Sequence, residues 1–104
     1  MSPIVINAVA FQEDGLWIAQ CLEYDFVGCA ETLDELPDEF LGQVTDQIEA
    51  DLEAGHEPFF GFKPAPQRYW ALFAAARAVS KPLKPRKDDL AHPQVQTQLF
   101  PVAA

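Results

Sequence analysis

The sequence predicts an α+β fold: a three- to four-stranded antiparallel sheet packed against one long acidic helix, with a second, shorter helix nearer the C-terminus. Two observations indicate this class. Residues 3–31 contain three short apolar segments separated by turns, and residues 34–54 repeat apolar side chains every four positions, as one buried helix face does. At 104 residues, of which 49% are hydrophobic and 12% aromatic, the chain is long enough for a single hydrophobic core.

The three strands are predicted over residues 3–11, 15–22 and 26–31. The first is β-branched or apolar at nearly every position, which is typical of a strand with neighbours on both sides. The sequence Glu-Asp-Gly at residues 13–15 is a tight turn of the kind that joins antiparallel strands. A three-stranded meander with the long helix across one face is the simplest topology.

The long helix, over residues 34–54, has clear start and stop signals. Thr32 followed by Glu35 is a capping box, and Asp34 is an alternative cap. Pro37 then falls in the first turn, so we expect that turn to be distorted and the helix to end before Gly55. The residues predicted to face the core are Leu36, Phe40, Val44, Ile48 and Leu52.

After this helix, residues 56–66 are too rich in proline and glycine for a further helix. The phenylalanines at positions 59, 60 and 62 either form a short fourth strand or fill the edge of the core. A second helix is predicted over residues 66–79, with Pro66 suited to its first turn.

We therefore divide the chain into one α+β domain, residues 1–79, and a weakly ordered, proline-rich basic linker and tail, residues 80–104. Within the tail, Val95, Thr97 and Leu99 alternate with glutamines, as in a weak edge strand or a docking peptide.

Charge is unevenly distributed along the chain. Residues 1–60 contain 14 of the 16 acidic residues and no Lys or Arg, whereas residues 61–104 contain all seven bases. An acidic half repels nucleic-acid phosphates and attracts basic protein surfaces, with simple solubility as the alternative explanation. No stretch is apolar enough to span a membrane and no secretory signal is evident, so we expect a cytoplasmic location.

No catalytic constellation is evident. Asp14, Glu23 and Asp25 are the carboxylates that could suggest a magnesium-dependent hydrolase, but they occupy turns, where acids usually face water. We therefore predict a non-enzymatic protein without metal or cofactor. Cys21 and Cys29 are expected to be two buried thiols, although a bridge across a hairpin is geometrically possible.

Residues 4–55 resemble the HicB-like antitoxin domain family. The family has a glycine-started second strand containing an alanine, an acidic or proline-containing turn, and then a Gly-Cys pair that leads through Thr-Leu-(Asp or Glu)-Glu into a long acidic helix. The matching residues are Gly15, Ala19, Glu23, Asp25, Gly28, Cys29, Thr32, Leu33, Asp34 and Glu35.

The resemblance implies a degraded RNase H-like fold without nuclease carboxylates. It also implies that the protein binds and inhibits a small basic HicA-type ribonuclease toxin and self-associates, so we expect a homodimer or larger. A stand-alone HicB-like module with an unrelated interaction or assembly role is the alternative. The candidate protein-binding residues are Glu31, Asp34, Asp38, Glu39, Asp46, Glu49 and Glu53, and the candidate self-association residues are Phe59, Phe60, Tyr69 and Phe73.

Overall fold

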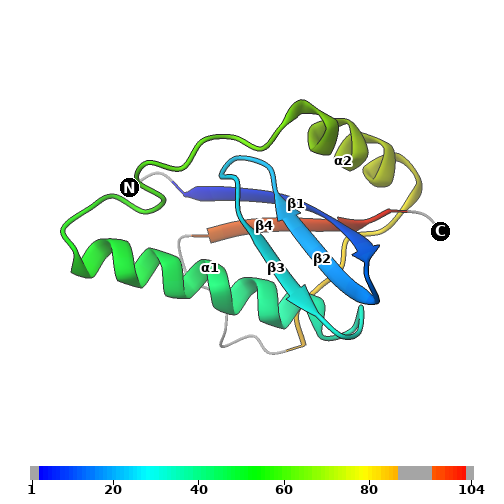
Figure 1. The fold of residues 1–104 in the computed structure, drawn as a ribbon, viewed down its shortest axis with the longest axis horizontal. Helices are drawn as coiled ribbons and strands as arrows, with labels where there is room; N and C mark the ends of the chain where they lie inside the picture. Colours follow the sequence, from blue (N-terminus) through cyan, green and yellow to red (C-terminus); the bar gives the residue numbers. More distant parts are fainter. Residues whose placement is uncertain (1–2, 87–94, 103–104) are drawn as a thin grey trace.

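The computed structural model describes residues 3–86 and 95–102 and has the predicted α+β architecture (Figure 1). A four-stranded mixed sheet carries one helix on each face. The elements in chain order are β1 Ile4–Glu13, β2 Leu16–Cys21, β3 Val27–Ala30, α1 Leu36–Glu53, α2 Gln67–Val79 and β4 Val95–Pro101.

The strand order is β3-β2-β1-β4, so β1 has a neighbour on both sides, as predicted. The first three strands form the antiparallel meander, but β4 runs parallel to β1, from Val95 beside Ile4 to Pro101 beside Ala10. An all-antiparallel sheet was therefore the wrong expectation for β4. Alternation of apolar residues reads the same in both directions along a strand, so it contains no information about strand direction.

The domain boundary at residue 79 is also wrong for residues 95–101. This segment is a full strand of the sheet, with Leu99 and Phe100 both buried, and not a weakly ordered tail. The remaining part of the predicted tail is described for residues 80–86 and 102, while residues 87–94 and 103–104 lie outside the described residues.

The hairpin between β1 and β2 has its two central residues in the left-handed region. Asp14 has φ 52° and Gly15 has φ 81°, while Glu13 and Leu16 pair on either side of them. Two successive positive φ angles characterise the type I′ turn, whose twist matches that of the flanking strands. The Asp-Gly sequence supplies residues that tolerate this conformation.

Helix α1 begins at Leu36, two residues later than predicted. The preceding turn contains one half of the predicted capping box, because the Glu35 backbone N–H donates to Thr32 Oγ1 (3.2 Å). The Glu35 carboxylate accepts from the Thr32 hydroxyl (2.7 Å) and not from the Thr32 backbone N–H. The N-cap residue is Glu35, without a side-chain cap hydrogen bond, so Thr32 and Asp34 were the wrong expectations for the cap. Pro37 lies in the first helical turn, where its missing N–H leaves no hydrogen bond unmade.

One face of α1 packs on the sheet through Phe40, Val44 and Ile48, all essentially inaccessible to solvent. Leu52 belongs to the same stripe but is 55% exposed, so its prediction as a core residue is wrong. Figure 1 shows that the C-terminal end of α1 extends past the ends of the strands.

Helix α2 covers part of the opposite face of the sheet. Its buried residues Phe73 and Ala76 pack against Val9, Leu22 and Phe100. The Phe73 and Phe100 rings meet edge to face, with centroids 5.5 Å apart. The helix contacts β1 and β4 and leaves the β3 side of this face open.

The loop between the helices fills the edge of the core and forms no strand. Phe59 is 3% exposed, and its ring stacks on Tyr24 with centroids 4.3 Å apart. Its backbone has φ 62° and its N–H donates to Asp51 Oδ2 (2.7 Å), which anchors the loop to α1. Phe60, by contrast, is 64% exposed.

Candidate protein-binding surface

The solvent-facing side of α1 carries a row of carboxylates. Glu39, Asp46 and Glu53 are seven residues apart, or about two helical turns, and Glu49 lies beside them. All four are exposed, and none has an ion pair within residues 3–86 or 95–102. We call Glu39, Asp46, Glu49 and Glu53 the acidic row. The row extends along most of the length of α1.

The other predicted binding residues, Glu31, Asp34 and Asp38, lie near the start of α1 and differ from the row. The Arg86 guanidinium is 4.0 Å from the Asp34 carboxylate, and the Arg86 backbone N–H donates to Asp38 Oδ1 (2.8 Å). Arg86, from the basic C-terminal part of the chain, therefore lies beside the acids at this end of the helix. The Asp34–Arg86 side chains are 80% and 68% exposed, so solvent screens the pair and its contribution to stability is small.

Arg86 was missed because it is 48 residues from Asp38, and only the return of the chain after α2 brings them together. The acidic row itself was found because its members lie on a single helix. Periodicity can place residues on a helix face, but it cannot show which distant segment reaches that face.

A groove of about 460 Å³ lies between α1 and β3, beside the acidic row. Its polar side chains, Gln43, Asp46 and Gln47, were not all predicted, although their spacing places the two glutamines on one flank of the helix. The groove is lined by Phe26, Val27, Gln43, Asp46, Gln47 and Ala50.

Gly28 allows α1 to approach β3 closely. A Cβ atom at this position would lie 3.1 Å from Gln43 Oε1, 3.2 Å from Phe40 Cδ1 and 3.3 Å from Phe40 Cα. The last of these is a backbone atom, so any side chain at residue 28 would push the helix away from the strand. The close packing of α1 on β3 therefore depends on a glycine at this position.

Two of the three turn carboxylates have hydrogen-bond partners within the fold. Glu23 accepts hydrogen bonds from the backbone N–H of Asn7 (2.7 Å) and from Asn7 Nδ2 (2.6 Å), and Asp25 accepts one from Gln20 Nε2 (2.9 Å). Asp14 is exposed at the hairpin tip. Within the described part of the chain, no three His, Cys, Asp or Glu residues are grouped so that they could hold a metal ion.

Most of the predicted self-association residues are covered within the chain. Phe59 and Phe73 are buried, so they are not available at the surface. Tyr69 is partly buried and stacks over Phe11 with ring centroids 6.0 Å apart. Phe60 remains exposed. Helix α2 and the loop therefore cover the sheet within one chain, and self-association stays a prediction.

The two cysteines lie in different environments, and both are free thiols. Cys21 is buried, and burial raises its pKa from 9.0 to about 12. Cys29 is exposed, so the expectation of two buried thiols is wrong for this residue. The strand register places Cys29 beside Ile18, on the part of the sheet face that α2 leaves open.

Family models, curated proteins and solved structures were all compared with this chain. None matches. Within the described residues, neither helix is long and apolar enough to cross a membrane.

Proposed function

We propose that this protein is a non-enzymatic, HicB-like protein-binding domain whose acidic row binds a small basic protein, as an antitoxin binds a HicA-type ribonuclease. The observation that supports this most directly is the acidic row. Its four exposed carboxylates have no ion pair among the described residues. Like charges held together on one helix repel each other, so they cost stability unless a basic surface covers them.

Such a row would act first on the rate of binding. Concentrated negative charge steers a basic protein toward the surface, which raises the association rate in a salt-dependent way. A ribonuclease recognises RNA phosphates through Lys and Arg side chains, and these same side chains would be drawn to the acidic row. Occupying them would keep RNA out, so inhibition would need no catalytic group on this chain.

The residues that support the family resemblance have structural roles in this fold. Gly28 permits close packing of α1 on β3, while Thr32 and Glu35 pair in the turn that starts α1. These roles account for the motif by packing and capping. The proposed binding role rests instead on the charge of the row.

The test is a double charge reversal, Glu39→Lys with Glu49→Lys. We expect the association rate with a catalytically inactive HicA-type ribonuclease to fall at least about tenfold at low salt, with a flatter salt dependence. The variant should keep its circular dichroism spectrum, because both side chains are exposed.

The matched control is Glu13→Lys with Glu57→Lys, which changes the net charge equally at two exposed sites outside α1. It should slow association far less. If the two double variants slow association equally, the association rate depends only on net charge and not on the acidic row. Unchanged binding in both would leave solubility as the role of the acids and would refute the proposal.

A further inference from the structure

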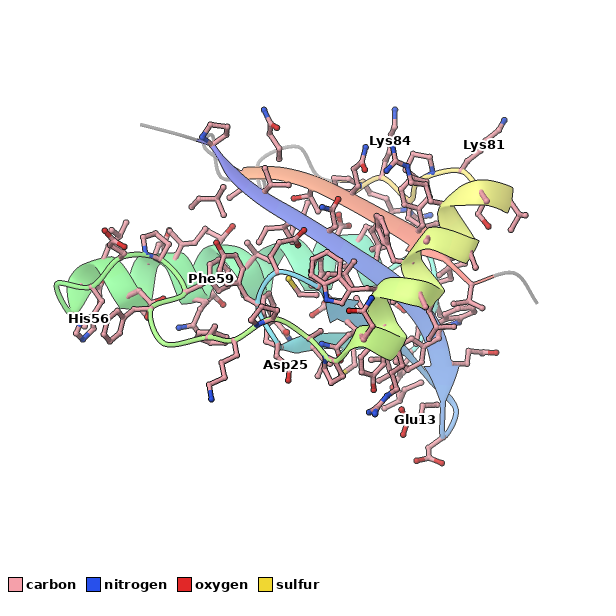
Figure 2. The ribbon with its side chains drawn as sticks, turned by 90° about the horizontal axis from the view of Figure 1, so that it is seen from above. Glu13, Asp25, His56, Phe59, Lys81 and Lys84 are labelled. Carbon is pink, nitrogen blue, oxygen red and sulfur yellow. The ribbon has the colours of Figure 1, made fainter. Side chains whose placement is uncertain are left out.

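The two edges of the sheet differ in how well they are closed. At the β4 edge, the Leu83 N–H donates to the Leu99 carbonyl (2.7 Å), and Pro101 has no N–H to offer. Proline at an outward-facing position is a common way of blocking an edge strand. Lys81 and Lys84 also project from this side of the molecule, opposite Glu13 and Asp25 (Figure 2).

The β3 edge is open. The Cys21 N–H donates to the Phe26 carbonyl (3.0 Å), while the Phe26 N–H donates to the Tyr24 carbonyl (2.8 Å), so Cys21 lies at a position of the hydrogen-bonded pairs of this ladder. Such pairs alternate with non-hydrogen-bonded pairs in an antiparallel sheet, so Gly28 also faces β2, whereas Val27 and Cys29 direct their N–H and C=O groups outward. No backbone group of the described residues bonds to them from that side.

The open stretch has a defined beginning. The Asp25 N–H donates to the Lys63 carbonyl (2.7 Å), which closes the edge just before β3 starts. From Val27 onward a strand could be added. It would lie about 4.8 Å from β3, over the groove that separates β3 from α1.

The two faces of the added strand would meet different surroundings. On the α1 side its side chains would enter the groove, where Gln43, Asp46 and Gln47 offer hydrogen-bond acceptors and one carboxylate. On the other side they would lie beside the side chains of Val27 and Cys29. Val27 also lines the groove, but its side chain alternates with Gly28, which packs on α1, and therefore lies on the face away from α1, where it is 51% exposed. Since successive side chains of a strand point to opposite faces, the matching sequence alternates basic and apolar residues.

We propose that the β3 edge receives a strand of the basic partner, with Lys or Arg side chains toward Asp46 and apolar side chains toward Val27. This inference rests on the proposed function and specifies how the partner binds. Adding a strand to an exposed edge gives affinity through backbone hydrogen bonds and specificity through alternate side chains. A second copy of this chain is a poor fit, because residues 1–60 contain 14 acids and no base, and pairing two β3 edges would bring two acidic rows together.

The probe is a blocked heptapeptide of alternating lysine and valine. Its control has the same composition but groups the lysines and the valines in blocks. At low salt we expect the alternating peptide to slow amide hydrogen exchange of Val27 and Cys29 at least about tenfold, and to leave Leu99 at the opposite edge unchanged. Equal binding of the two peptides without protection of Val27 and Cys29 would show attraction by charge alone and would overturn the proposal.

Two variants test the edge directly. Cys29→Pro removes an outward N–H without removing a bond to β2, and should weaken the alternating peptide about tenfold. Val27→Lys leaves the backbone intact but places a cation beside the added strand, and it should weaken binding of the alternating peptide by a similar factor. It serves as the test if the Cys29→Pro variant does not fold. Asp46→Asn should weaken binding more than Glu53→Gln, since Asp46 lines the groove and Glu53 does not. If the Val27→Lys variant binds the alternating peptide as tightly as the wild type does, strand addition at the β3 edge is refuted.

The same variants separate the two proposals when the inactive ribonuclease is the ligand. If the Glu39→Lys, Glu49→Lys double slows association and the β3 variants do not, the acidic row binds the partner and the strand addition is wrong. If the β3 variants also weaken binding, both are supported. If neither set has an effect, the proposed function fails and strand addition to this partner fails with it.

Discussion

The contact between Gly28 and α1 provides the sharpest test of the packing described above. In Gly28→Ala the new Cβ would lie 3.1 Å from Gln43 Oε1 and 3.3 Å from Phe40 Cα. The glutamine side chain can move, but the helix backbone cannot yield without disturbing the core. Overpacking of this kind typically costs about 1–3 kcal/mol, offset by about 0.5–1 kcal/mol because alanine restricts the unfolded chain more than glycine does. We expect a net loss of about 0.5–2 kcal/mol.

Gly42→Ala is the matched control, because it makes the same chemical change within α1 itself. A Cβ at residue 42 meets nothing within 4 Å, and its φ is not in the left-handed region. Alanine is the better helix former by about 1 kcal/mol, so this variant should be more stable than the wild type. The two substitutions should therefore shift stability in opposite directions.

Urea unfolding followed by circular dichroism measures both free energies of unfolding. The midpoints should move in opposite directions with the slopes unchanged, so that the shifts report stability alone. A Gly28→Ala protein as stable as the wild type, or more so, would refute the close approach of α1 to β3. The groove between them would then be wider than described.

Three further predictions concern burial. Ile48→Ala should lower the free energy of unfolding by about 2–5 kcal/mol and Leu52→Ala by less than about 1 kcal/mol, because Ile48 is 1% and Leu52 is 55% exposed. Urea unfolding measures both losses. Similar losses for the two variants would contradict the position of Leu52 beyond the ends of the strands. Iodoacetamide should modify Cys29 in the native protein and Cys21 only after unfolding. Burial raises the Cys21 pKa to about 12, so the folded thiol keeps a proton that the unfolded chain releases above pH 9. The free energy of unfolding should therefore fall between about pH 9 and 12. The fall should be larger in the wild type than in Cys21→Ala.

The sequence alone determined the elements whose signals are local. Short apolar segments separated by turns identified the first three strands, and the Asp-Gly turn identified the hairpin between β1 and β2. A four-residue repeat placed Phe40, Val44 and Ile48 on one face of α1. Each of these features depends on residues within a few positions of each other, so propensity and periodicity are sufficient to find them. The acidic row was predictable for the same reason.

Only the tertiary structure decided which of these faces have a neighbour. Leu52 has the same period as Ile48 but lies beyond the sheet, and Cys29 lies on a face that α2 does not reach. The parallel pairing of β4 with β1 and the approach of Arg86 to Asp38 join segments tens of residues apart. Periodicity records which side of an element is apolar, whereas burial, strand direction and an open edge depend on contacts between distant parts of the chain, which a local pattern does not encode.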